Sequence, residues 1–182
     1  MRVGEGAAAV FVLNEERGVY IELLERCRLG EADAFDELVL RYQNPVYNLA
    51  YRLLGSHDAA RDVVRDTFVR AYRGMQDFPG DARVHTWLYS IVGNLARNVM
   101  RDMDEERGVS EKRISVEDED LLQDSIEQLP QHARIVFVLS TFEGLRYEEI
   151  AEAVGCPRGT VKSRMTQART LLGDMLSPHG IV

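Results

Sequence analysis

The chain has 182 residues, with 22 basic and 30 acidic side chains and a formal net charge of −8. No apolar stretch approaches the roughly 20 residues needed to cross a bilayer, so we expect no membrane insertion. Cys27 and Cys156 are far apart, and the four histidines lack metal-ligand spacing. This pattern argues against a disulfide framework and against a metal site, and nothing in it calls for a cofactor. A reducing, cytoplasmic location is expected.

Residues 1–20 are expected to form an N-terminal arm. An apolar run from Ala7 to Leu13 is followed by Asn14, Glu15 and Glu16, where a signal peptide would have small residues and a cleavage site. We therefore expect a loose or docking arm rather than an export signal.

Residues 21–101 show helical periodicity, and we expect a compact bundle of three or four helices. Apolar residues recur at steps of three and four in three stripes. Gly55 is expected to end one helix, and Ser56 or Asp58 to cap the next. The prolines are expected at segment edges or in turns. The stripes consist of Leu38, Tyr42, Val46, Leu49, Ala50 and Leu53; then Val64, Phe68, Ala71, Tyr72 and Met75; then Trp87, Leu88, Ile91, Val92, Leu95 and Val99.

The segment 102–120 has a different composition. It contains nine acidic and three basic residues, a net charge of −6, and few aliphatic side chains. Such a segment cannot bury enough apolar surface to fold alone, so it is expected to be a linker. Two interpretations remain open: a solvated spacer, or a tether that enters a positively charged channel on a partner.

Helical periodicity returns over residues 121–176, and residues 177–182 form a short tail. Within this part, Tyr147 to Leu172 has the form of a helix-turn-helix, with Gly155 and Pro157 in the turn. The expected fold is therefore all-α, with two small helical domains joined by an acidic linker.

The second helix of this motif is a candidate DNA-reading element. No acidic residue lies between Glu152 and Asp174, whereas four basic residues do, as phosphate contact requires. The alternative is an ordinary surface helix with a basic face. The candidates, called here the −35 set, are Arg158, Thr160, Lys162, Ser163, Arg164, Gln167 and Arg169.

A second candidate region lies between Asp81 and Asp102, which also lacks acidic residues. It mixes cations with aromatic rings, a combination suited to unstacked bases. Trp87 and Tyr89 could equally be core aromatics at helical spacing. The candidates, called here the −10 set, are Arg83, His85, Trp87, Tyr89, Asn94, Arg97 and Arg101.

Charges of alternating sign follow Gly55 at helical steps. They suit either a solvated helix with internal ion pairs or a protein-docking face. The charged residues are Asp58, Arg61, Asp62, Arg65, Asp66 and Arg70.

Taken in order, these motifs resemble the extracytoplasmic-function (ECF) sigma factors, minimal bacterial sigma factors with regions 2 and 4 only. The resemblance covers residues 25–176 approximately and rests on two separate motif sets. In the first are Gly30-Glu31-Ala32-Asp33-Ala34-Phe35, Asp62-Val63-Val64, Asp66-Thr67-Phe68-Val69-Arg70-Ala71-Tyr72 and Thr86-Trp87-Leu88-Tyr89. In the second are Leu129-Pro130, Arg134, Tyr147-Glu148-Glu149-Ile150-Ala151 and Gly155 through Arg164.

The resemblance implies a function. Region 2 would dock on the clamp helices of core RNA polymerase and hold flipped bases of the −10 element with the −10 set. Region 4 would place the −35 set in the major groove and hold the polymerase flap. It also implies an anti-sigma factor as partner, a monomer, and no catalysis. The docking residues implied, called here the docking set, are Asp58, Arg61, Asp62, Arg65, Asp66 and Phe68.

Four positions depart from the family pattern. Arg61 and Arg65 replace residues that are often Glu and Gln, Gly93 stands inside a helix, and Arg146 replaces a usual Ser at an N-cap. These departures leave a second interpretation open: a sigma-like decoy that binds an anti-sigma factor without initiating transcription. A conventional helix-turn-helix regulator and an enzyme are weaker alternatives.

Overall fold

The computed structural model describes residues 21–78, 83–107 and 118–179. These residues form helices joined by turns and contain no strand, which confirms the all-α prediction. The N-terminal half contains a helical segment at 21–28, then α2 (Ala32–Leu54), α3 (His57–Gly74), a short 3-10 turn (Met75–Asp77) and α4 (Val84–Arg107). The C-terminal half contains α5 (Asp118–Glu127), α6 (Gln131–Thr141), α7 (Tyr147–Val154), α8 (Arg158–Leu176) and a 3-10 turn (Ser177–His179).

The turn between α2 and α3 forms as the sequence predicts. Gly55 has φ +65°, and its N–H donates to the carbonyl of Tyr51 at 2.8 Å. A left-handed residue at this position favours glycine, which has no Cβ to clash. The Ser56 hydroxyl then accepts from the N–H of Ala59 at 3.4 Å and caps α3.

Most residues of the three predicted stripes are buried in the first bundle. Leu38, Leu49 and Leu53 on α2 are fully buried, as is Leu88 on α4. Tyr72 is an exception, because its side chain is 54% exposed. Helical spacing places Tyr72 beside the buried residues of α3 but does not decide whether another element covers it.

Pro45 lies inside α2, contrary to the expectation that the prolines mark segment edges or turns. A proline has no N–H to donate to the preceding turn, which normally disfavours a helix interior. Here the helix continues through it, because Val46, Leu49 and Ala50 behind it are fully buried. Tertiary packing overrides the local preference.

The helix-turn-helix forms from α7 and α8. Gly155 ends α7 with φ +66°, and Pro157 immediately precedes the first residue of α8. Val161, Met165 and Ala168 on α8 are buried and hold it against the preceding helices. α6 and α7 both pack on α8.

Helices reach into both ends of the expected 102–120 linker. α4 continues to Arg107 and α5 begins at Asp118. The middle of that linker, residues 108–117, and the expected arm, residues 1–20, lie outside the described residues.

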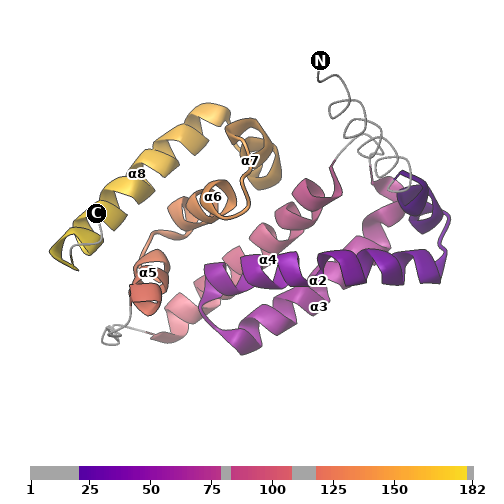
Figure 1. Ribbon diagram of the computed structural model, residues 1–182, viewed down its shortest axis with the longest axis horizontal. Coiled ribbons are helices and arrows are strands. Elements are labelled where there is room, and N and C mark those ends of the chain that lie inside the picture. Colours follow the sequence, from indigo (N-terminus) through magenta and orange to yellow (C-terminus); the bar gives the residue numbers. More distant parts are fainter. Residues whose placement is uncertain (1–20, 79–82, 108–117, 180–182) are drawn as a thin grey trace, which may run out of the picture.

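The two halves pack directly on one another. α4 contacts α7 and α6, and α2 contacts α5 and α6. Figure 1 shows α5 to α8 lying along one side of the bundle formed by α2 to α4. Their buried side chains form a single continuous hydrophobic cluster. The sequence predicts two domains, but it does not predict this shared core.

Candidate nucleic-acid and protein interfaces

The outer side of α8 carries the −35 set. Val161, Met165 and Ala168 face the core, so the side chains between them point outward. Lys162, Ser163, Gln167 and Arg169 are exposed, whereas Thr160 and Arg164 are half-buried. Arg158, Lys162 and Arg169 recur at steps of four and seven and so share one side of the helix. The structure thus brings most of the set to one surface.

Three members of the −35 set contact another side chain of the chain. The Arg158 guanidinium lies 2.7 Å from a Glu148 carboxylate oxygen of α7. His132 Nε2 and Gln167 Oε1 are 3.1 Å apart. These contacts fix the directions of two exposed side chains before any ligand arrives. Arg164 Nη1 lies 3.7 Å from the Cys156 sulfur in the turn.

The N-terminus of α7 is capped despite the missing Ser. The Arg146 N–H donates to Glu149 Oε2 at 2.9 Å, so the Glu half of a capping box is present. This hydrogen bond, with support from the Arg146 and Arg83 charges, holds the pKa of Glu149 below its usual value. Arg83 also forms an ion pair with Glu149, with 3.0 Å between Arg83 Nη1 and Glu149 Oε1.

The −10 set does not form one surface. Asn94, Arg97 and Arg101 are exposed on the C-terminal part of α4. Arg83 and His85 lie at its N-terminal end, beside α7. Burial, followed by the charge of Arg83, lowers the pKa of His85.

The two aromatic members of the −10 set are occupied by internal packing. Trp87 lies 4.9 Å from Phe78, centroid to centroid, and is half-buried within the first bundle. Tyr89 is only 6% exposed, and its hydroxyl hydrogen-bonds to Glu143, in the turn after α6. Burial and this hydrogen bond raise the pKa of Tyr89. In this conformation both rings are therefore packed as core aromatic residues, the alternative that their helical spacing also allowed.

The charged members of the docking set lie on the exposed side of α3. Arg61 pairs with Asp58 at 2.8 Å, and Arg65 pairs with Asp62 at 3.0 Å and with Asp66 at 3.7 Å. The two unusual arginines are thus neutralised by neighbours one turn away. Exposed pairs of this kind contribute little to stability, about 0.5 kcal/mol each. The ion pairs and a docking role are compatible, because these side chains remain more than half exposed.

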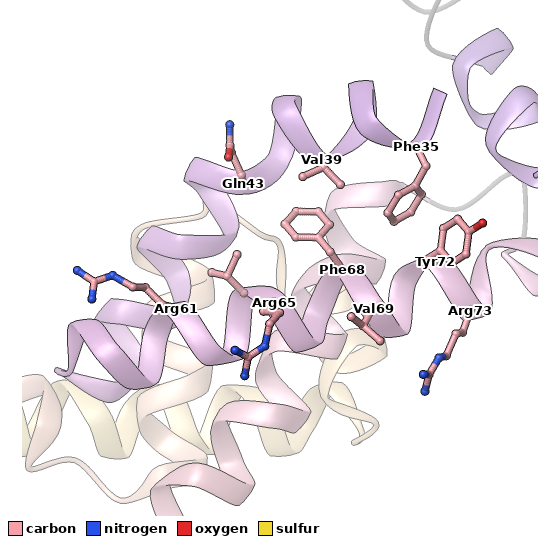
Figure 2. Close-up of a pocket in the computed structure, with 10 residues that line it drawn as sticks. Phe35, Val39, Gln43, Arg61, Arg65, Phe68, Val69, Tyr72 and Arg73 are labelled. Atoms are coloured by element: carbon pink, nitrogen blue, oxygen red, sulfur yellow. The ribbon is translucent and has the colours of Figure 1, made fainter. Parts of the chain in front are cut away.

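Beside these charges, α2 and α3 form an apolar groove of about 740 Å³. Figure 2 shows the rings of Phe35, Phe68 and Tyr72 along the groove. Phe35 and Tyr72 meet edge to face at 5.0 Å between centroids. The guanidinium groups of Arg61, Arg65 and Arg73 lie around it.

Several groove residues are absent from the docking set predicted from the sequence: Val39, Val69, Tyr72 and Arg73. Val69 is 43% exposed and Tyr72 is 54% exposed. The sequence did contain a signal for them: α3 has more apolar positions than one buried stripe needs. Such an excess indicates a second apolar face that no other helix covers. Only the packing of α2 against α3 shows which positions remain outside.

No cluster of His, Cys, Asp and Glu in the described ranges could hold a metal ion. No helix among the described residues is long and apolar enough to cross a membrane.

Two family models match the chain in order. The model for sigma-70 region 2 matches residues 38–105, and the model for sigma-70 region 4 matches residues 119–172. The first match covers most of α2, all of α3 and most of α4. The second covers α5 to α7 and most of α8. Two sigma regions in this order distinguish the chain from a conventional helix-turn-helix regulator.

Characterised proteins of the same kind align over most of the chain. The RNA polymerase sigma-H factor of Pseudomonas aeruginosa is 36% identical over 180 residues, covering 86% of this chain and 93% of that protein. The ECF RNA polymerase sigma-E factor of Escherichia coli K12 is 36% identical over 179 residues, with the same coverage. A solved structure of the sigma factor RpoE from Bartonella quintana, in complex with the anti-sigma factor NepR, superposes with a TM-score of 0.68 at 27% identity, covering 79% of this chain and 96% of that one.

These relatives are transcription initiation factors of a non-enzymatic family, and they favour an initiating role over the decoy. The order of the two regions, the all-α fold and the similarity over most of both chains lead to one conclusion. The chain belongs to the extracytoplasmic-function group of the sigma-70 family and is a bacterial transcription initiation factor.

Proposed function

We propose that the chain divides its initiating role among three surfaces, each carried by one of the residue sets defined above. The observation that carries this proposal is the outer side of α8. It presents Lys162, Ser163 and Arg169 to solvent, and the sequence contains no carboxylate between Glu152 and Asp174. Cations on an exposed recognition helix provide both phosphate contact and base-edge donors in the major groove. Region 4 thus reads the −35 element.

The groove between α2 and α3 is proposed to dock core RNA polymerase at its clamp helices. A helix of the partner can place apolar side chains against Phe68, Val69 and Tyr72 while its acidic side chains meet the surrounding arginines. Arg61 and Arg65 replace residues that are often Glu and Gln, so this site has more positive charge than usual, and the complementary partner surface carries acidic groups beside apolar ones. In this proposal the polymerase flap binds region 4.

The −10 element is proposed to bind along α4. Arg97 and Arg101 supply phosphate contacts, and Asn94 supplies a donor and an acceptor for a base edge. Unstacked bases need flat faces as well, and Tyr89 provides one when it is accessible. The acidic linker is proposed to run toward the positively charged channels of the polymerase.

The proposed setting is cytoplasmic, where polymerase and promoter DNA are found, and the proposed free form is a monomer. An anti-sigma factor is proposed as a further partner. The Bartonella quintana relative is held by the anti-sigma factor NepR, which supports such a partner for this chain. It would cover the polymerase-docking surfaces of both regions.

Reconstitution tests the proposal. The purified chain is added to bacterial core RNA polymerase with a library of genomic fragments, and transcript starts are mapped. We expect discrete starts that share two short upstream elements. A folded chain that neither binds a compatible core nor produces such starts would refute the initiating role.

A matched pair of variants tests the groove. Val69→Glu places a carboxylate in the groove and is expected to weaken core binding at least tenfold. Leu40→Glu changes an even more exposed apolar residue, 69% exposed, that does not line the groove. It is expected to bind core as the unchanged chain does. Equal losses in both variants would show that the groove has no special role.

A further inference from the structure

The side of α8 that points away from the core carries a stripe of uncharged polar residues. The buried residues of α8 recur at steps of three and four. A helix turns by about 100° per residue, so the positions opposite the buried ones recur at the same steps. These positions are exposed, and we call them the outer stripe. They are Ser163, Thr166, Gln167 and Thr170.

Cations flank the outer stripe. Lys162 and Arg169, seven residues apart, lie along one side of it, and Arg164 lies along the other. Phosphates border the major groove and base edges form its floor, so a helix in the groove needs cations at its flanks and polar groups between them. The outer stripe is therefore placed to face base edges.

Two hydroxyl groups of the outer stripe already donate to the backbone of α8. Ser163 Oγ donates to the carbonyl of Thr160 at 2.9 Å, and Thr166 Oγ1 donates to the carbonyl of Lys162 at 3.1 Å. A hydroxyl has one hydrogen, so both oxygens are left to act as acceptors. Gln167 is the member of the stripe with an amide, which carries donors as well as an acceptor.

His132, in the first turn of α6, decides which half of this amide points outward. His132 Nε2 lies 3.1 Å from Gln167 Oε1. An amide oxygen only accepts hydrogen bonds, so Nε2 carries a hydrogen and donates it. The contact turns Oε1 toward α6 and leaves the NH2 group pointing away from it. His132 is itself exposed, but its neighbours Ala133 and Arg134 are buried and anchor its backbone.

Guanine is the base that suits an outward NH2 group. In the major groove it presents two adjacent acceptors, O6 and N7, and no donor, so both amide hydrogens find a partner. Thymine has one acceptor beside a methyl group, whereas adenine and cytosine each present an amino group that donates. Glutamine commonly pairs with adenine through both halves of its amide. With Oε1 turned toward α6, that pairing is disfavoured here.

We propose that His132 is a positioning residue for base recognition. It holds the amide of Gln167 with its donors toward the DNA, so that α8 selects guanine at one base pair. His132 acts through Gln167 and does not itself contact the base. The inference rests on the proposed reading of the −35 element by region 4.

Selection from duplex DNA of random sequence tests the proposal on the full chain. Duplexes bound by the chain alone, and by the chain with core RNA polymerase, are recovered and sequenced. Gln167→Ala identifies the base pair in question, because this variant abolishes discrimination there. We expect the unchanged chain to prefer guanine at that position by at least about fivefold, the lower end for a base-edge contact.

Two variants of His132 make opposite predictions. His132→Arg carries donors only, so it should keep Oε1 turned inward and retain the preference for guanine. His132→Glu carries acceptors only, so it should draw the NH2 group inward and turn Oε1 toward the DNA. The preference should then pass to adenine or cytosine on the same strand.

The ranking of bases distinguishes positioning from a merely structural role. The charge that each His132 variant adds acts on phosphates and changes the affinity for all sequences alike. A contact that only stabilised α6 against α8 would leave the ranking the same in both variants. Equal rankings would therefore overturn the proposal.

A modified base identifies the contacted strand. 7-Deazaguanine has a C–H group in place of N7 and so lacks that acceptor. Replacing the selected guanine with it is expected to weaken binding by the unchanged chain a few-fold and to leave Gln167→Ala unaffected. Unaltered binding by the unchanged chain would contradict donation to guanine.

Transcription by the reconstituted holoenzyme separates this inference from the proposed function. A position that depends on Gln167, without transcript starts, would count against polymerase docking and leave the reading by Gln167 in place. If transcript starts occur but no position depends on Gln167, this inference is wrong and the docking proposal stands.

Discussion

The guanidinium of Arg134, in region 4, donates a 2.9 Å hydrogen bond to the carbonyl of Leu53, in region 2. The two residues are 81 positions apart in the sequence. The same guanidinium donates to the carbonyls of Glu127 and Leu129, so it links the end of α2 to the turn before α6. One buried cation thereby holds three backbone groups from both halves of the chain.

Replacing this cation tests its contribution to stability. Arg134→Met keeps an apolar stem of similar length but leaves the carbonyls without their donor. Hydrogen bonds from a charged donor contribute about 1.5–3 kcal/mol, so the free energy of unfolding is expected to fall by about 2–3 kcal/mol. Urea denaturation followed by circular dichroism measures it. Arg70→Met, at an exposed site, should change it by less than about 0.5 kcal/mol.

Gly55 tests the turn between α2 and α3. Its φ is +65°, and an added Cβ would meet the Glu127 side chain of region 4. Gly55→Ala is expected to lower the free energy of unfolding by about 1–2 kcal/mol, because a left-handed conformation strains any residue with a Cβ. Gly159→Ala is the matched control. That position is helical and has open space around it, so alanine should be neutral or stabilising by up to about 1 kcal/mol. An equal loss in both variants would contradict this account.

Substitutions of Lys162 and of Glu148 are expected to have opposite effects on DNA binding. Lys162→Ala removes a phosphate contact and should weaken duplex binding by the holoenzyme, lowering the salt slope by about one. Glu148→Gln removes the carboxylate that holds Arg158 at 2.7 Å and should strengthen binding, because the arginine becomes available to phosphate. Holoenzyme binding to a duplex promoter probe, measured over a range of salt concentrations, checks both. The assignment of α8 would be wrong if neither change altered the salt slope.

His85 predicts a pH dependence of stability. Its folded pKa is below the ordinary value of 6.5, mainly because of burial and then because of the charge of Arg83, with Glu149 of α7 opposing the shift. The unfolded chain therefore takes up a proton as the pH falls below about 6.5 while the folded chain resists. The free energy of unfolding should decrease from pH 7 toward pH 5, with part of this slope due to His85.

His85→Gln should remove that part of the slope, as measured by urea denaturation at several pH values. The Glu149 carboxyl acts in a separate window, because its lowered pKa stabilises the fold above about 4.5 and this stabilisation is lost as the pH falls further. A slope between pH 7 and pH 5 that is unchanged in His85→Gln would show that the histidine is not its source.

Local signals in the sequence predicted the helices well. Gly55 and Ser56 act at the turn as expected, since left-handed geometry and capping are properties of a few adjacent residues. Pro45 was misjudged because a long buried stripe outweighs one missing hydrogen bond. The spacing of Tyr72 predicted a place in a buried stripe, but its side chain lines the groove. Spacing within one helix does not show whether another helix covers a given side chain.

The sequence by itself determined the all-α fold, the basic recognition helix and the order of the two sigma regions. Periodicity, local charge and motif spacing depend only on residues that are close together in the sequence. The tertiary structure alone decided that region 4 lies on α4, that Tyr89 is covered and that the α2–α3 groove is open. These properties depend on contacts such as Arg83 with Glu149, whose partners are 66 positions apart. No local pattern encodes which faces of two amphipathic bundles meet, because many pairings would bury similar apolar area.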